Sequence, residues 1–333
     1  MVQIRRIKMI PLMNLDRQYA SLQEQLDEAA LKVLHSGNYI LGEEVTEFEK
    51  EFANYCGVKY AVGVGNGTDA LIIALQACGI KPGDEVIIFT PAFVSYQNTV
   101  LLCEGIPVEI PLKASNEFQI DIEELKSKIT NKTKMMIINN PSNPTGAVYQ
   151  KETLEKVCQL ARENNILILA DEIYNQLDYE KQYVSIASFE NMKDYTIIVN
   201  GFSKAYAMTG WRMGYIAASK KHIDHILKVH QYTTTSQMTF AQIGMAKAID
   251  QEDVKKEVQH MIQTFHERRT FIMEQLDQCE NLSYIIPHGA FYIMVDVSKT
   301  GFNGQEFADK LLDYGVAVVP ASGFGKGLNN FIR

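Results

Sequence analysis

Six short apolar runs recur along the first two thirds of the chain, and none of them alternates with polar residues. Strands that are apolar on both sides are buried on both faces, which is typical of a parallel or mostly parallel sheet covered by helices. We therefore predict that each run is a strand of one such sheet. The runs are YAVGV (60–64), EVIIF (85–89), MMIIN (135–139), ILILA (166–170), TIIVN (196–200) and MGYIAA (213–218).

Helical patterns separate most of these runs. They cover residues 69–78, 122–129 and 151–164. Strands that alternate with helices define an α/β domain. Over residues 253–280, apolar residues recur at helical spacing on a charged background, which predicts one long helix that leads out of this domain.

The remainder of the chain predicts a smaller unit. Two strand-like segments, AFYIMVDVS (290–298) and VAVVP (316–320), flank the helical segment GQEFADKLLDYG (304–315). We expect a large domain over residues 46–280, which includes the long helix, and a small α+β domain over residues 281–333. The N-terminal segment 1–45, with a helix around residues 20–34, is expected to complete the small domain.

Composition and charge narrow the possible partners. A chain of 333 residues, 46% of them hydrophobic, can bury one large core and a smaller one. The net charge of −8 argues against a nucleic acid or an anionic membrane as the main partner, so we expect a small-molecule substrate. The five cysteines are widely spaced, which indicates buried thiols in a reducing, cytoplasmic setting and no metal site. No apolar run reaches membrane-spanning length.

The segment NGFSKAYAMTGWRMGY (200–215) combines a lysine, a serine and an arginine in an apolar setting. A lysine becomes a nucleophile at neutral pH when its pKa falls, as it does in a partly dry pocket near another cation. Lys204 is the candidate nucleophile and Arg212 the candidate second cation. Ser203 and Arg212 could also hold a phosphate dianion. The alternative is a surface lysine and an arginine paired with a carboxylate.

Other polar residues follow the predicted strands, where ligands bind in open α/β sheets. After the first strand, Gly67 and Thr68 offer free amides to a phosphate, or they belong to an ordinary turn with Thr68 or Asp69 as the helix N-cap. After the ILILA strand, Asp171 either keeps a ring nitrogen protonated or caps a following helix. Tyr174, on the same side of the turn, could donate to a phenolate oxygen.

Three further positions are consistent with a cofactor site, and each has a structural alternative. Asn143, in a loop stiffened by prolines, offers a fixed amide or belongs to a rigid turn. Phe93 offers a face for a flat ring, or is a core aromatic residue. Arg333, the last residue, either clamps a carboxylate or is solvated. Together the sites supply a phosphate cradle, a ring-nitrogen partner, a phenolate partner, a stacking face and an amine.

These residues resemble the class I/II aminotransferases of the pyridoxal-phosphate fold-type I superfamily. The similarity covers residues 68–333 and rests on the segments SNPTG, DEIY and SKAYAMTGWRMGY. It implies a pyridoxal 5′-phosphate enzyme with a mostly parallel seven-stranded sheet in its large domain, which transfers an amino group between an amino acid and a 2-keto acid. It also implies a homodimer with sites at the interface. With HILKVHQYTTT, the lysine segment most resembles the N-acetyl-diaminopimelate aminotransferase branch, followed by aspartate and aromatic aminotransferases.

The resemblance implies a role for each candidate residue. Lys204 would carry the cofactor and move the proton, and Asp171 would pair with the pyridine nitrogen. Tyr174 and Asn143 would contact the phenolic oxygen, and Phe93 would stack on the ring. Arg333, with Asn143, would bind the substrate carboxylate, and Tyr39 would contact the phosphate in the neighbouring subunit. The residues implied to bind the phosphate are Gly67, Thr68, Ser203 and Arg212.

Two departures from the family pattern affect these expectations. Residues 10–22 and 36–71 resemble the sugar aminotransferases instead, so the N-terminal substrate elements are expected to differ. The family continues beyond the carboxylate-binding arginine, so we expect a minimal small domain. The alternatives that remain open are a carbon–sulfur β-lyase, a sugar aminotransferase and a non-catalytic protein that binds pyridoxal phosphate.

Overall fold

A seven-stranded sheet forms the centre of the computed structural model, which describes residues 16–37 and 40–333. Its strand order is β1-β7-β6-β5-β4-β2-β3, and only β7 runs antiparallel to its neighbours. The predicted mostly parallel sheet is therefore confirmed. The strands are β1 (Tyr60–Val64), β2 (Glu85–Thr90), β3 (Ile106–Pro111), β4 (Thr133–Asn139), β5 (Leu167–Asp171), β6 (Thr196–Gly201) and β7 (Gly214–Ala218).

The strand that the apolar pattern missed is β3, at the edge of the sheet. Its sequence IPVEIP is only partly buried and contains two prolines, which cannot donate to a neighbouring strand and are confined to such edges. The other six strands match the six apolar runs. The direction of β7 was not predictable from its run, because a strand that is buried on both faces reads the same in either direction.

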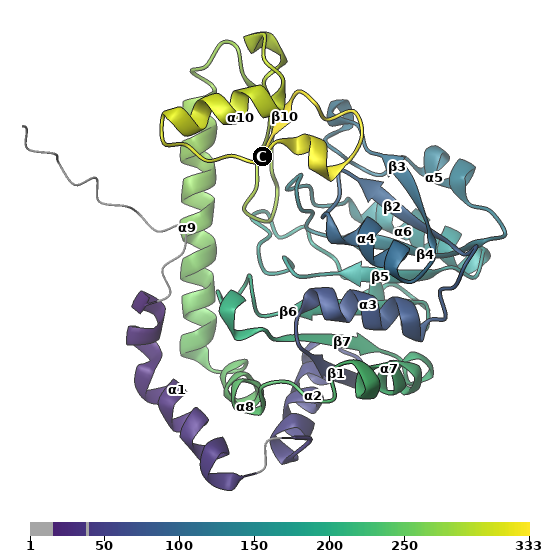
Figure 1. Ribbon diagram of the computed structural model, residues 1–333, viewed down its shortest axis with the longest axis vertical. Helices are drawn as coiled ribbons and strands as arrows, with labels where there is room; N and C mark the ends of the chain where they lie inside the picture. Colours follow the sequence, from purple (N-terminus) through teal and green to yellow (C-terminus); the bar gives the residue numbers. More distant parts are fainter. Residues whose placement is uncertain (1–15, 38–39) are drawn as a thin grey trace, which may run out of the picture.

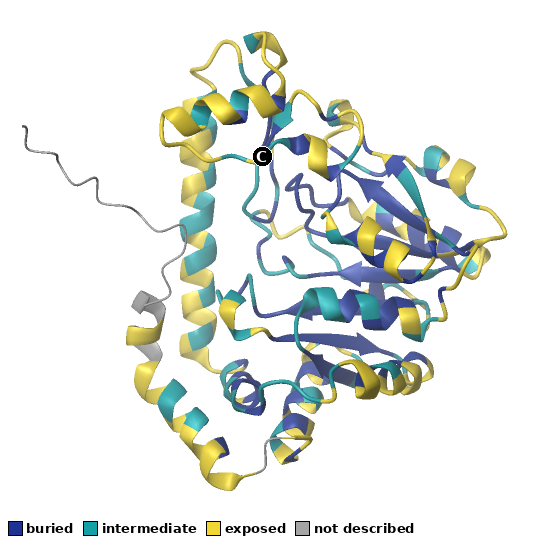
Figure 2. Ribbon diagram, in the orientation of Figure 1, coloured by how far each residue is buried: buried dark blue, intermediate teal, exposed yellow. Residues whose placement is uncertain are grey.

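Helices cover both faces of the sheet, and the strands between them are buried, apart from the edge strand β3 (Figures 1 and 2). On one face α3 (Gly67–Ala77), α4 (Ser95–Leu102) and α7 (Lys220–Thr233) enclose a core with Val86 and Ile88 of β2. On the other face α5 (Ile122–Lys128) and α6 (Lys151–Glu163) pack on Ile87 and Phe89. At the β1 end, α2 (Glu43–Tyr55) and α8 (Thr239–Ala248) complete this second face.

The long helix α9 (Glu252–Leu276) leads from the large sheet to a second, three-stranded antiparallel sheet (Figure 1). The second sheet is shorter than the pattern predicted, because 290–298 contains only the strand β9 and 316–320 forms no strand. The elements of this unit are β8 (Ser283–Ile285), β9 (Met294–Asp296), α10 (Gly304–Asp313) and β10 (Phe331–Ile332). Short 3-10 helices lie at Ala114–Asn116, Ile186–Ser188, Thr209–Trp211, Ser298–Thr300 and Ala321–Phe324.

The N-terminal helix α1 (Asp16–Ser36) packs against α8, near the end of α9 that is remote from the three-stranded sheet (Figure 1). The expected division at residues 45 and 280 stays a prediction. No helix within the described residues is long and apolar enough to span a membrane.

The small unit is held against the large sheet by the loop that follows β4. The backbone amides of His288 and Gly289 both donate to the carbonyl of Gly146, each at 2.9 Å. Gly146 has φ +70, and a Cβ added there would lie 2.4 Å from Cβ of Pro287. This close approach requires glycine and fixes the segment 287–292 beside the SNPTG loop.

We predict that Gly146→Ala destabilises the protein more than Gly79→Ala does. Both glycines have positive φ, but a Cβ at Gly79 would meet nothing within 4 Å. Gly79→Ala therefore costs only the backbone strain, about 1 kcal/mol, whereas Gly146→Ala adds a steric clash of about 1–3 kcal/mol. The free energies of unfolding in urea measure the difference. Equal losses in the two variants would contradict the described packing of the loop on Pro287.

Candidate active site

Lys204 lies in the turn that follows β6 and is half-buried beside two aromatic rings. Its Nζ is 5.8 Å from the ring centroid of Tyr174 and 5.7 Å from that of Phe291. Burial, and after it the Arg333 cation, lower the pKa of Lys204. The lysine is therefore not the freely solvated surface residue of the alternative interpretation.

Two other charged residues act on the same amine. The Asp171 carboxylate opposes the fall in the pKa of Lys204, and Arg212 adds to it less than Arg333 does. The sequence suggested Arg212 as the second cation, so the larger influence of Arg333 is a finding of the structure. It arises because the end of the chain returns to the large sheet, which local sequence patterns do not reveal.

Asp171 ends β5 and is buried, with hydrogen-bond donors on both carboxylate oxygens. The hydroxyl of Tyr96 donates to Oδ2 at 2.7 Å, and the backbone N–H of Ile173 donates to Oδ1 at 3.2 Å. Burial raises the pKa of Asp171, and these two hydrogen bonds oppose the rise. The following residues form a turn rather than a helix, so the helix-cap alternative is wrong.

The surroundings of Asp171 fit a cationic ring nitrogen. In the part of the chain that the structure describes, no lysine, arginine or histidine lies within 4.0 Å of this carboxylate. A buried carboxylate is costly without a positive partner. Phe93 is half-buried next to Tyr96, the donor to this carboxylate; the two rings meet edge to face, with centroids 5.8 Å apart. A protonated pyridine beside Phe93 would supply the missing charge.

Tyr174 is buried, and its hydroxyl lies 2.7 Å from the hydroxyl of Tyr292. Tyr292 comes from the segment 287–292 that the Gly146 loop fixes. Sequence reasoning did not select it, because the segment AFYIMVDVS was interpreted only as a strand. The run of glycine, alanine and two aromatic residues ahead of that strand was the available signal.

Asn143 and Arg333 meet although they are 190 positions apart. Nη1 of Arg333 donates to Oδ1 of Asn143 at 2.8 Å, and the backbone N–H of Asn143 donates to Oδ1 of Asn139 at 2.8 Å. The guanidinium of Arg333 also lies over the ring of Tyr292, at 4.4 Å from Cζ to the centroid. Arg333 is therefore part of the same site as Tyr174 and is not a solvated terminal residue.

The predicted phosphate residues lie at the start of α3. Asn66, rather than Thr68 or Asp69, is the N-cap of this helix: its Oδ1 accepts from the amides of Thr68 and Asp69, at 2.9 and 3.1 Å. The amide of Thr68 is therefore occupied, and the expectation that it is free for a phosphate is wrong. A Cβ added to Gly67 would meet nothing within 4 Å, so the space beside this residue is open. An anion at this end would benefit from the helix dipole.

The sheet register places this helix start beside the lysine turn. Val64, Gly214 and Gly201 pair in one row across β1, β7 and β6, so the loops that follow Val64 and Gly201 leave the same edge. In the second of these loops, the carbonyl of Ser203 accepts from the Thr209 hydroxyl.

Among the described residues, Arg212 makes no hydrogen bond or ion pair with the start of α3. Arg212 is exposed and donates from Nη1 to the carbonyl of Thr209 at 2.9 Å. Tyr39, the candidate for a contact with a neighbouring subunit, lies outside the described residues.

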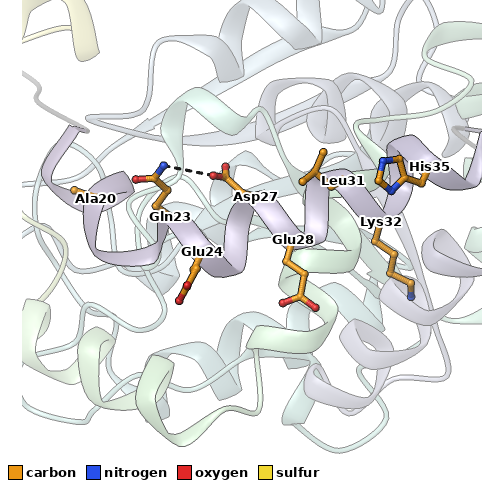
Figure 3. A pocket seen from close by; sticks show the side chains of 8 residues that line it. All are labelled: Ala20, Gln23, Glu24, Asp27, Glu28, Leu31, Lys32 and His35. Atoms are coloured by element: carbon orange, nitrogen blue, oxygen red, sulfur yellow. Dashed lines mark hydrogen bonds between the residues drawn. The ribbon is translucent and has the colours of Figure 1, made fainter.

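A separate hollow of about 760 Å³ runs along α1 (Figure 3). Its acidic and basic lining residues are Glu24, Asp27, Glu28, Lys32 and His35, all from the same helix. Acidic groups outnumber basic ones there, and none of the residues discussed above contributes to it. Its three carboxylates disfavour a phosphate anion, so it is not a candidate for the cofactor site.

Known proteins resemble this chain along most of its length. Residues 14–333 match the family model of "Aminotransferase class I and II". An aspartate aminotransferase of Pyrococcus abyssi is 42% identical over 266 residues, which are 79% of this chain and 68% of that protein. Aromatic-amino-acid aminotransferase 2 of Thermococcus litoralis is 38% identical over 297 residues, 88% of this chain and 76% of that protein. The crystal structure of an aromatic aminotransferase from Pyrococcus horikoshii has a TM-score of 0.87 at 36% identity, covering 93% of this chain and 86% of that one.

The chain therefore belongs to the class I and II aminotransferase family. It is an aminotransferase that depends on pyridoxal 5′-phosphate, as its resemblance to this family had implied.

Glu172, next to Asp171, is a buried carboxyl that sequence reasoning did not select. Its Oε1 accepts a hydrogen bond from the hydroxyl of Ser185 at 2.6 Å. Burial raises the pKa of Glu172 to about 7, against the opposing effect of Ser185. This carboxyl therefore changes its charge near neutral pH.

We predict that Glu172→Gln removes part of the pH dependence of stability. Between the ordinary value of 4.5 and about 7, the folded protein keeps a proton on Glu172 that the unfolded chain has lost. The free energy of unfolding therefore falls as pH rises through this window, by about 3 kcal/mol for a shift of this size. Glutamine does not titrate, so the variant should lose this decrease and be the more stable protein at about pH 8.

Urea unfolding of the holoenzyme at about pH 5.5 and about pH 8 covers the upper part of this window, in which about 2 kcal/mol of the decrease falls. Glu257→Gln, an exposed substitution on α9, is the matched control and should keep the wild-type pH dependence. If Glu172→Gln retains the full decrease, then Glu172 is not the titrating group.

Proposed function

We propose that this aminotransferase binds the α-carboxylate of its amino-acid substrate through Arg333 and Asn143, with the substrate amine directed toward Lys204. The observation that carries the proposal is the 2.8 Å hydrogen bond between Arg333 and Asn143. It leaves a planar cationic fork at the site of the half-buried Lys204. Such a fork suits a carboxylate, which accepts two parallel hydrogen bonds from it.

The proposed amino donors are aspartate, glutamate, an aromatic amino acid or N-acetyl-diaminopimelate, and the acceptor is a 2-keto acid. Relatives named aspartate and aromatic aminotransferases, at 42% and 38% identity, make these two the first donors to test. The resemblance of the lysine segment to the acyl-diaminopimelate branch adds the last donor.

The residues present fit pyridoxal phosphate. Asp171 pairs with the ring nitrogen and favours its protonated form, because a buried carboxylate stabilises a neighbouring cation. The other proposed contacts are Phe93 with the ring face, Tyr174 and Asn143 with the phenolic oxygen, and Gly67, Thr68, Ser203 and Arg212 with the phosphate. When bound, the cofactor supplies an electron sink for the bond that breaks at the substrate Cα.

Lys204 is the base of the proposed mechanism. Its Nζ would take the proton from the substrate Cα and deliver it to the cofactor carbon. Burial and Arg333 lower the pKa of this amine, so a larger fraction of it is neutral and able to accept a proton. The aromatic rings of Tyr174 and Phe291 beside Nζ exclude water from that side.

We also propose that the protein is a cytoplasmic homodimer. Leu31, Ile40 and Leu41 are large apolar side chains, each at least 50% exposed, near the junction of α1 and α2. A second copy that covers them would remove this apolar area from water. The five cysteines are all unpaired, which agrees with a reducing compartment.

The function is tested by mixing the purified holoenzyme with single amino acids and recording the visible absorbance of the bound cofactor. We expect at least one proposed donor to convert the cofactor to its amine form, and a 2-keto acid to restore it. Lys204→Ala should lose the lysine-bound absorbance and turnover. Lys156→Ala, at an exposed position of α6, should behave as the wild type.

Other outcomes would replace the proposal. A wild-type cofactor that no amino donor converts would indicate a non-catalytic binding protein. Pyruvate and ammonia released from cystathionine without a keto acid would indicate a β-lyase. Conversion only by a nucleotide-linked amino sugar would indicate a sugar aminotransferase, and full activity of Lys204→Ala would eliminate the proposed base.

A further inference from the structure

Tyr292 contacts the two proposed functional groups of the site at once. Its hydroxyl lies 2.7 Å from that of Tyr174, and its ring face lies 4.4 Å from Cζ of Arg333. The rings of Tyr292 and Tyr174 meet edge to face, with centroids 5.7 Å apart. One side chain therefore spans the distance between the proposed cofactor side and the proposed carboxylate side.

An anionic oxygen next to the hydroxyl of Tyr174 would decide which of the two tyrosine hydroxyls donates to the other. A tyrosine hydroxyl donates one proton and can accept others. Burial raises the pKa of both Tyr174 and Tyr292, so both hydroxyls keep their protons near neutral pH. When Tyr292 donates to Tyr174, the proton of Tyr174 remains available for the stronger, anionic acceptor, and each bond strengthens the other.

The ring of Tyr292 restrains Arg333 from one side. Phe324 lies on the guanidinium as well, at 4.8 Å from Cζ to its ring centroid. The hydrogen bond to Asn143 fixes the direction of the fork. A guanidinium against aromatic faces is attracted by them and keeps its edge free for a planar anion.

The backbone that carries Tyr292 is itself held on both sides. The amide of Ala290 donates to the carbonyl of Leu177 at 2.7 Å, and the amide of Gly289 donates to Gly146 at 2.9 Å. Ala290 has φ +55, a conformation that costs energy for a residue with a side chain. The segment thus presents Tyr292 in one place relative to the loop that follows β5 and to the SNPTG loop.

We propose that Tyr292 is a positioning residue that acts through both Tyr174 and Arg333. Its hydroxyl directs the proton of Tyr174 toward the cofactor oxygen, and its ring holds the carboxylate-binding arginine. This inference rests on the proposed function, because it needs Tyr174 at the cofactor and Arg333 at the substrate. The charged groups that face the tyrosine pair are Lys204, Arg333 and Asp171.

Two substitutions separate the two effects in the holoenzyme. Tyr292→Phe removes only the hydroxyl, and Tyr292→Leu removes the ring as well. In Tyr292→Phe, weaker donation by Tyr174 destabilises the deprotonated form of the lysine-bound cofactor. The pH midpoint of its absorbance should therefore rise by about half to one unit, the size of one neutral hydrogen bond. Affinity for a carboxylate inhibitor should stay within about twofold, since the ring remains.

Tyr292→Leu should show the same shift in the midpoint and also weaker carboxylate binding. We expect the dissociation constant of succinate or 3-phenylpropionate, whichever the wild type binds, to rise about five- to tenfold. Tyr314→Phe and Tyr314→Leu are the matched controls, because Tyr314 is 85% exposed, and they should change neither quantity.

The results that would overturn the inference differ from those that would overturn the function. A wild-type midpoint in Tyr292→Phe would refute the role of the hydroxyl. This variant should fold normally, because it keeps the ring that packs against its neighbours. Wild-type affinity in Tyr292→Leu would refute the role of the ring. A wild-type protein that binds no cofactor, or transfers no amino group, would instead refute the proposed function.

Discussion

A carboxylate that is buried at the end of a central strand is the constraint on which the site depends. Asp171 is removed from water, and among the described residues its carboxylate has only Tyr96 and the amide of Ile173 as donors; burial raises its pKa. Such a group destabilises the protein unless a cation completes it. In the proposed function, Asp171 would hold the protonated ring nitrogen of pyridoxal phosphate, which would supply this cation, and the same contact would favour the electron-withdrawing form of the ring.

The rest of the fold brings distant segments to this carboxylate. The parallel strands supply the lysine turn and the start of α3 from one edge of the sheet. The small unit supplies Tyr292 and Arg333, and Gly146 fixes the segment that carries Tyr292. The pKa of Lys204 responds to both parts, since burial and Arg333 lower it while Asp171 opposes them. The chemistry of the amine thus depends on how the two units are packed.

The sequence predicted most of the sheet because continuous apolar runs report burial on both faces, a property of each strand alone. It missed β3, where edge exposure and two prolines erase that pattern. Candidate residues could be selected because they follow strands whose ends meet. Their partners could not: Tyr96 on Asp171, Tyr292 on Tyr174 and Asn66 as the N-cap are contacts that depend on tertiary packing or on competition between neighbouring caps.

The central claim is that one lysine, Lys204, holds the cofactor beside Asp171. Reduction of the holoenzyme with borohydride fixes a cofactor to the lysine that carries it, and peptide mass spectrometry then identifies that lysine. The account predicts a single pyridoxyl adduct, located on the peptide that contains Lys204. An adduct on any other lysine, or none in a protein that retains its cofactor, would contradict it.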